Sequence, residues 1–310
     1  MTQICKYMDD IHERARAATK ERPLRLAVAS AGEAHVLAAV GRAVAAGYVE
    51  AVLFGDQAQT EELADAAALD VAQATLHHAE TPLEAGRLAV QAVSSGACDL
   101  LMKGYIRTSL LMREVLNKEY GLRGPGKLSH VLVIDAPHYD KLYLMSDGAL
   151  NIDPDLSLKL EIVNNAVALA HALGIELPKV ALLAAIETVD MAQPSSVDMA
   201  IIAKMADRGQ IKGALVDGPL ALDNAINAHA AKVKRIKSEV AGDADVLIVD
   251  NIDVGNVFYK SLVFFASANV AGIVTGGSAP IILTSRADST ETKFNSVALG
   301  CALAAQGVSG

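Results

Sequence analysis

Short apolar runs alternate with longer segments of helical periodicity over the first third of the chain. The run Leu24 to Ala29 predicts a buried strand, and Glu33 to Ala46 follows with apolar residues at helical spacing before Gly47. Such alternation is typical of a parallel sheet with helices on both faces. The same pattern predicts strands at Val49 to Phe54, Val71 to His77 and Cys98 to Met102, and helices at Glu61 to Leu69 and Pro82 to Ser95.

The pattern changes after the glycine-rich segment Gly121 to Gly126. Two runs of alternating polarity, His130 to Asp135 and Lys141 to Ser146, predict an antiparallel hairpin. Strands and helices then alternate again, so we expect an α/β protein of two domains, residues 1–125 plus 272–310 and residues 126–271. The later predicted elements are helices at Leu156 to Leu173, Val197 to Arg208 and Val254 to Ala268, a helix from Leu220, and strands at Val180 to Ile186, Ala214 to Asp217, Val246 to Val249 and Val270 to Val274.

Composition narrows the possible partners. Hydrophobic residues make up 52% of the 310 residues and aromatic residues only 4%, so the core must consist mainly of Ala, Val, Leu and Ile. The formal net charge of -9 argues against nucleic acid or an anionic membrane as a general partner, because the overall field repels polyanions. An anionic substrate therefore needs a local basic pocket.

The cysteines and the first residues bear on the compartment. Cys5, Cys98 and Cys301 form no CxxC pair, which favours neither a disulfide framework nor a zinc site. The segment Met1 to Glu21 is polar, and no apolar run is long enough to cross a bilayer. We therefore expect a cytoplasmic protein with reduced, buried thiols.

The segment from Pro280 to Lys293 carries the clearest candidate chemistry. Its apolar strand stops at Ser285 and Arg286, where a hydroxyl and a guanidinium meet the free N–H groups of a following helix. The planar donors of arginine match phosphate oxygens. Asp288 and Glu291 also have the spacing of a capping box, which alone explains a helix start. If Asp288 caps the helix, then Ser285, Arg286 and Lys293 remain free for a ligand.

Three other strand-to-helix segments admit a structural and a functional interpretation. Lys103 ends a strand at the crevice position of α/β sheets, either as an anion anchor or as a solvated lysine. Thr108 is equally explained as the N-cap of a helix from Ser109 to Leu116. In the segment Asp250 to Lys260, Gly255 and Asn256 in the first helical turn indicate close approach of a ligand or a neighbouring backbone, and Asn251 or Asp253 could cap the helix. In the segment Asp217 to Asp223, Pro219 is expected at the first helical position and Asp217 is taken as structural.

Well-known nucleotide, metal and esterase motifs are missing from the sequence. There is no GxxxxGK[ST], no GxGxxG after a strand, no HExxH and no GxSxG. His77 and His78 lie on adjacent strand positions and point to opposite faces, so they cannot chelate a metal together.

Several segments, in this order, resemble the phosphate acetyltransferase and phosphate butyryltransferase family. The resemblance runs from about residue 24 to the end of the chain. The segments are Leu101-Met-Lys-Gly104, Ser146-Asp-Gly-Ala-Leu-Asn-Ile-Asp-Pro154, Asp217-Gly-Pro-Leu-Ala-Leu-Asp-Asn-Ala-Ile226, Asp245-Val-Leu-Ile-Val-Asp-Asn-Ile-Asp-Val-Gly-Asn256 with Tyr259-Lys260, and Pro280-Ile-Ile-Leu-Thr-Ser-Arg-Ala-Asp288.

The resemblance implies reversible transfer of a short acyl group between coenzyme A and inorganic phosphate, by direct attack in a ternary complex. It implies a two-domain fold like that of isopropylmalate dehydrogenases, with the active site in the cleft between domains. Coenzyme A is then a substrate, with no other cofactor and no metal. A homodimer or a higher homo-oligomer is expected, with the dimer interface in residues 126–271.

The resemblance also implies roles for particular residues. Ser285 and Arg286 match the pair beside the thioester. Counting to the family's proposed aspartate base lands on Thr292, so the adjacent Glu291 is the candidate base, although it points about 100° away around the helix. This departure resembles the butyryl-type branch and the acyltransferase halves of hydratase fusions. The candidate substrate-binding residues are Lys103, Thr108, Asn256, Lys260 and Lys293.

Two competing functions stay open at this point. A decarboxylating dehydrogenase that requires a metal and NAD would need clustered carboxylates, for which Asp245, Asp250 and Asp253 are the only tempting set. A non-catalytic domain that senses acyl-CoA is the other, but the retained Ser285 and Arg286 favour catalysis.

Overall fold

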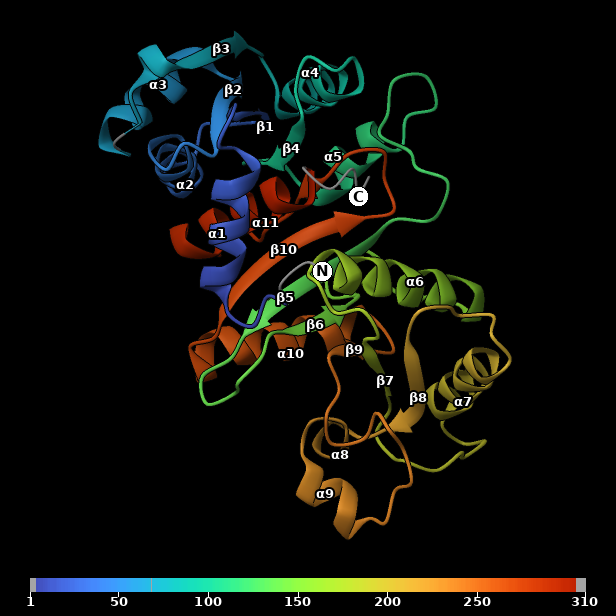
Figure 1. Cartoon of the computed structure of the whole chain (residues 1–310). Coiled ribbons are helices and arrows are strands. Elements are labelled where there is room, and N and C mark those ends of the chain that lie inside the picture. The colour runs from blue at the N-terminus through green and yellow to red at the C-terminus, as the bar shows by residue number, and fades with distance from the viewer. Residues whose placement is uncertain (1–3, 68, 305–310) are drawn as a thin grey trace. The chain divides into compact units, whose positions relative to one another are not determined.

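The computed structural model describes residues 4–67 and 69–304, which form two compact units (Figure 1). The first unit comprises Met8–Gly126 and Val270–Gly310, and the second comprises Met1–Tyr7 and Lys127–Asn269. Residues 4–7 thus group with the second unit, whereas the expected division placed them in the first. One reason is that the N–H of Cys5 donates to the carbonyl of Leu173, at 3.0 Å.

The first unit is built on strands in the order β3–β2–β1–β4–β11–β10. All neighbouring pairs among them are parallel except β10 with β11. The strands are β1 (Leu24–Ala29), β2 (Val49–Gly55), β3 (Ala74–His78), β4 (Leu100–Lys103), β10 (Asn269–Thr275) and β11 (Ile281–Ile282). The helices are α1 (Met8–Ala18), α2 (Ala34–Ala45), α3 (Gln57–Ala66), α4 (Pro82–Ser94), α5 (Thr108–Val115) and α11 (Thr290–Ala304).

Helix α11 is buried on nearly all sides, because it lies between α1, α2 and the sheet (Figure 1). Its C-terminal half packs so closely on the sheet that a Cβ on Gly300 would lie 3.0 Å from Cδ1 of Ile282. This packing fixes the helix, and hence the segment that enters it from β11.

The second unit has strands in the order β5–β6–β9–β7–β8. Strands β5 and β6 form the predicted antiparallel hairpin, and the other pairs are parallel. The strands are β5 (Ser129–Asp135), β6 (Tyr143–Ser146), β7 (Lys179–Leu183), β8 (Leu215–Leu220) and β9 (Val246–Ile248). The helices are α6 (Leu156–Ala172), α7 (Pro194–Asp207), α8 (Leu222–Ile226), α9 (Ala228–Val233) and α10 (Ile252–Ala266).

Two predicted elements are wrong in part. The expected strand from Val71 begins instead with the 3-10 turn η1 (Val71–Gln73), which Asp70 caps by accepting the N–H of Ala72 at 3.0 Å. Pro219 lies within β8 and follows a cis peptide bond, whereas the first helical position after it is Leu222. The mixed α/β class with mostly parallel strands is confirmed.

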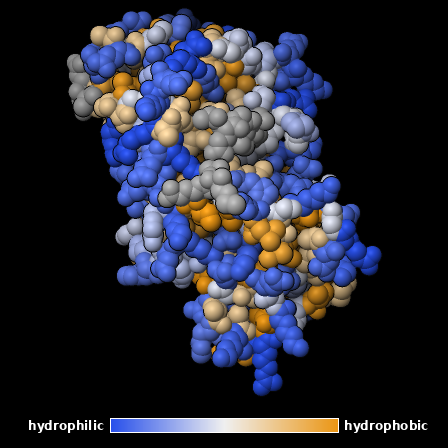
Figure 2. Space-filling model, viewed as in Figure 1, coloured by the Kyte–Doolittle hydropathy of each residue, from blue (hydrophilic) through white to orange (hydrophobic). Residues whose placement is uncertain are grey.

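The surface and the helix lengths carry one more observation. On the face shown in Figure 2, hydrophilic side chains predominate and apolar residues form small separate groups. Within residues 4–67 and 69–304, none of the helices combines the length and the apolar character required to span a membrane.

Candidate functional site

The carboxyl ends of β1, β4 and β11 lie next to one another in the first unit. The register pairs Ala29 with Lys103 and Met102 with Ile282, all in parallel, so the residues after each strand share one edge. Close packing there requires glycine at position 104, because a Cβ would lie 2.2 Å from the carbonyl oxygen of Ser30. The edge therefore gathers the segments that begin at Ser30, Gly104 and Thr284.

Lys103 is buried at this edge, and the solvated interpretation of it is wrong. Its side chain is 4% exposed, and its Nζ donates to the carbonyl oxygens of Thr284 at 3.2 Å and Gly104 at 3.4 Å. Burial, and then the positive charges of Arg286 and Lys293, lower its pKa to about 8. The ammonium group of Lys103 thus lies near the positive charges of Arg286 and Lys293, and such a site attracts an anion.

The segment after β11 forms a tight turn closed by Asp288. The carboxylate of Asp288 accepts the N–H of Ser285 at 2.6 Å, and the N–H of Asp288 donates to the carbonyl of Ser285 at 3.2 Å. Ser285 and Arg286 are exposed, with the guanidinium carbon of Arg286 5.7 Å from the ring centroid of Tyr105. The hydroxyl and the guanidinium are therefore open to a ligand.

The capping box predicted for Asp288 and Glu291 is wrong. Helix α11 begins at Thr290, and the hydroxyl oxygen of Ser289 accepts the N–H of Thr292 at 3.1 Å. Ser289 therefore caps the helix, and the carboxylate of Asp288 is used inside the turn.

Lys293 lies beneath the same turn. Its Nζ donates to the carbonyl oxygens of Asp288 at 2.6 Å and Ser285 at 3.3 Å. Burial lowers the pKa of Lys293, while the negative charges of Asp288 and Glu33 act in the opposite direction. Glu33 caps α2 by accepting the N–H groups of His35 and Val36, and its negative charge also acts at this edge of the sheet. From its sequence alone, Glu33 was interpreted only as the start of a helix.

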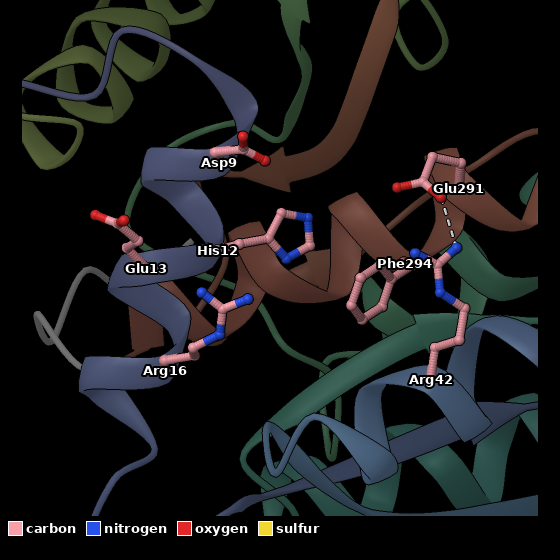
Figure 3. A pocket seen from close by; sticks show the side chains of 7 residues that line it. All are labelled: Asp9, His12, Glu13, Arg16, Arg42, Glu291 and Phe294. Atoms are coloured by element: carbon pink, nitrogen blue, oxygen red, sulfur yellow. Dashed lines mark hydrogen bonds and ion pairs between the residues drawn. The ribbon is translucent and has the colours of Figure 1, made fainter.

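Glu291 lies elsewhere, in a hollow of about 420 Å³ between α1, α2 and α11 (Figure 3). Its carboxylate pairs with Arg42 at 2.5 Å, and the Arg42 guanidinium covers the ring of Phe294 at 4.1 Å. Among the described residues, no hydrogen bond or ion pair joins Glu291 to Ser285, Arg286 or Lys103. The role of Glu291 as a base stays a prediction, which this ion pair does not support.

Thr108 is not an N-cap. It is the first residue of α5, and Arg107 occupies the cap position without a side-chain hydrogen bond. Thr108 is half-buried and lies five residues after Lys103 on the same connection from β4 to α5. Its hydroxyl is thus available at the start of a helix, next to the edge described above.

The candidates Asn256 and Lys260 belong to the second unit. They lie one turn apart on α10, which follows β9 and is capped by the side chain of Asn251. Gly255 is explained by a neighbouring backbone, since a Cβ there would lie 2.6 Å from the carbonyl oxygen of Asp147. Asn256 is half-buried and Lys260 is exposed, so both can meet a ligand on one face of the helix.

An ionic cluster in the second unit was missed by sequence reasoning. Lys159 is buried and donates to Asp250 at 2.6 Å and to Asp198 at 2.8 Å. Burial lowers the pKa of Lys159, but its hydrogen bonds to Asp198 and Asp250 outweigh this, so the pKa is raised. Nothing in the sequence distinguishes Lys159 from a solvated helix lysine, because its partners are distant along the chain.

Two of the aspartates considered as metal ligands form ion pairs with different lysines. Asp245 pairs with Lys141 at 2.7 Å, whereas Asp250 pairs with Lys159. Within the described parts of the chain, no group of three or more His, Cys, Asp or Glu side chains is arranged to hold a metal ion.

Known proteins resemble this chain over most of its length. The family model "Phosphate acetyl/butaryl transferase" matches residues 75–301. "Phosphate butyryltransferase" of Clostridium beijerinckii is 46% identical over 288 residues, which is 93% of this chain and 95% of that protein. "Phosphate acetyltransferase" of Thermotoga maritima is 43% identical over 298 residues, which is 96% of this chain and 100% of that protein.

A solved structure agrees with these relatives. That of a branched-chain phosphotransacylase from Enterococcus faecalis V583 has a TM-score of 0.80 at 34% identity, and the match covers 91% of this chain and 99% of that one. Since sequence and structure agree over nearly the full length, the family prediction is confirmed. The chain belongs to the phosphate acetyl/butyryl transferase family and is an acyltransferase.

Proposed function

We propose that the chain moves a short acyl group reversibly between coenzyme A and inorganic phosphate, with Ser285, Arg286 and Lys103 as its reacting site. The observation that carries this is the cluster of Lys103, Arg286 and Lys293 around the exposed Ser285. In residues 4–67 and 69–304, none of these cations forms an ion pair with a carboxylate. Such a site has a positive potential that favours a phosphate dianion.

The reaction proceeds by direct attack in a ternary complex. A phosphate oxygen bonds to the thioester carbonyl carbon, the C–S bond breaks, and its electron pair leaves on the sulfur as a thiolate that takes a proton from water. Arg286, through its guanidinium and its main-chain N–H, stabilises the tetrahedral oxyanion, and the Ser285 hydroxyl donates to the sulfur or the carbonyl oxygen. Coenzyme A enters as a substrate, and no further cofactor or metal is required.

The other candidate residues are assigned to substrate binding. Thr108, at the start of α5, offers a hydroxyl to phosphate. Asn256 and Lys260 offer an amide and an ammonium to the phosphates of coenzyme A, because both lie on one face of α10. We place the enzyme in the cytoplasm, which the buried, free thiols of Cys98 and Cys301 support.

The release of free coenzyme A from acetyl-, propionyl- and butyryl-CoA, followed with a thiol reagent with and without phosphate, tests this function. We expect release that requires phosphate and that yields an equal amount of acyl phosphate. Release at the same rate without phosphate would indicate hydrolysis and would contradict the proposal.

A general base is expected to contribute little to the rate, since phosphate is already mostly ionised near pH 7. Replacing Glu291 by glutamine is therefore expected to change kcat/KM by less than about threefold, because the carboxylate is paired with Arg42. Initial rates at saturating and limiting phosphate measure this. A loss of about 10²-fold would instead restore Glu291 as the base.

A homodimer with its interface in the second unit is also proposed, and α10 supports it. This helix buries only Gly255 and Tyr259, while Phe264 and Phe265 are 70% and 92% exposed. Exposed aromatic residues of this kind are typical of the buried centre of protein interfaces.

Replacing Phe264 and Phe265 together by aspartate is expected to convert the dimer to a monomer, because two charges would then face the interface. Sedimentation equilibrium of the wild type and the variant measures the mass. The matched control is Met191→Asp, an exposed apolar residue of the same unit outside α10, which should leave the mass unchanged. A wild-type protein that is already monomeric would refute the dimer.

A further inference from the structure

The ammonium group of Lys293 is buried, and its hydrogen-bond partners are main-chain carbonyls. The side chain is 1% exposed, and its Nζ donates to the carbonyls of Asp288 and Ser285. Within the described residues no carboxylate forms an ion pair with it. Burial of an ammonium group without a carboxylate carries a desolvation cost, so its retention indicates a task that the charge or the donors perform.

Two lysines hold consecutive peptide groups of the turn. Lys103 donates to the carbonyl of Thr284, and Lys293 donates to the carbonyl of Ser285. In a trans peptide the C=O and the N–H point in opposite directions. The carbonyl of Ser285 is held toward Lys293, so the N–H of Arg286 points away from the lysine. That peptide plane also sets where the Arg286 side chain leaves the chain.

Asp288 completes the arrangement from the other side. Its carboxylate accepts the N–H of Ser285, while its own carbonyl is the shorter of the two contacts of Lys293, at 2.6 Å. The first turn of α11 thereby fixes both ends of the segment Ser285 to Asp288. Without the ammonium, each of the two carbonyls would lose a donor, and the carbonyl of Ser285 would keep the N–H of Asp288.

We propose that Lys293 is a positioning residue that does not contact substrate itself. It holds the carbonyls of Ser285 and Asp288, and it thereby aims the Ser285 hydroxyl and the Arg286 donors at the reacting group. This inference rests on the proposed function. It reassigns Lys293, which the sequence analysis grouped with the substrate-binding residues.

Replacement of Lys293 by methionine keeps the aliphatic stem and removes the donors. We expect kcat to fall about 30-fold or more, because the oxyanion donors are misaligned by small distances, and KM for acyl-CoA to change less than about threefold. The loss of one positive charge is expected to raise KM for phosphate by a smaller factor than the fall in kcat. The control Lys20→Met makes the same chemical change at an exposed position of the first unit and should leave both constants unchanged. An increase of KM at constant kcat would make Lys293 a substrate ligand and overturn the proposal.

A double-mutant cycle separates positioning from a general loss of structure. In an Arg286→Ala background, Lys293→Met is expected to lower kcat by a clearly smaller factor than in the wild type, since one of the two groups that it aims is already missing. Independent, multiplicative losses would overturn the proposal.

The replacement Lys293→Gln retains an amide donor without charge and is expected to recover part of the lost kcat. Circular dichroism melting of each variant checks folding, and failure of both to fold would assign Lys293 to stability and overturn the inference. The wild type in the same assay distinguishes the two claims. An inactive wild type contradicts the proposed function, whereas an active wild type with unchanged Lys293 variants contradicts only the positioning role.

Discussion

Replacement of Arg286 by alanine is expected to lower kcat/KM by about 10²-fold or more while the protein still folds. The guanidinium is exposed beside Ser285, makes no ion pair within the described residues, and is the only planar donor group on the turn. In the proposed mechanism it neutralises the attacking phosphate and the developing oxyanion, so its loss is expected to raise the barrier of the chemical step. Steady-state kinetics of coenzyme A release with butyryl-CoA and phosphate measure the effect.

Two further variants sharpen this result. Arg286→Lys keeps the charge without the planar donors, and an intermediate loss is expected because lysine cannot bond two oxygens in parallel. Arg22→Ala is the control, since Arg22 is an exposed arginine of the same unit that pairs with Asp99. Kinetics of Arg286→Ala that match those of Arg22→Ala would remove Arg286 from the mechanism.

Regular elements were predictable where burial makes the pattern simple. The strand Leu24 to Ala29 was predicted with its exact bounds, because it lies between β2 and β4 and its last four residues are buried, which gives a continuous apolar run. The hairpin of β5 and β6 was predicted from two alternating runs around a short connection. These are local signals, so no distant contact was needed to find them.

The roles of single polar residues were harder, because distant partners decide them. Asp288 and Glu291 have the spacing of a capping box, yet Ser289 caps α11 and Glu291 pairs with Arg42, which is 249 positions away in the sequence. Likewise, a lysine at a strand end is usually solvated, and only the neighbouring strand β11 shows that Lys103 is buried. The sequence placed these residues on predicted elements, and the structure shows which side chains they contact.

The second large effect concerns Lys103 and depends on pH. Its pKa of about 8 lies below the ordinary lysine value, so the ammonium is charged below pH 8 and becomes neutral as the pH rises through 8. Burial is the largest cause of the lowered pKa; the charges of Arg286 and Lys293 lower it further, and those of Asp288 and Glu33 raise it. We therefore expect KM for phosphate to be lowest below pH 8 and to rise about tenfold per pH unit above it, because the neutral amine no longer attracts the anion.

Replacement of Lys103 by methionine should then raise KM for phosphate at pH 7 by about 10-fold or more, and should abolish the rise above pH 8 that the wild type shows. Methionine fills most of the buried volume, so a loss caused by a cavity is minimised. The ionisation of phosphate itself changes over the same pH range, but it affects the wild type and the variant alike, so the ratio of their KM values isolates the lysine. A ratio that stays constant from pH 7 to pH 9.5 would show that Lys103 carries no titrating charge at the phosphate site.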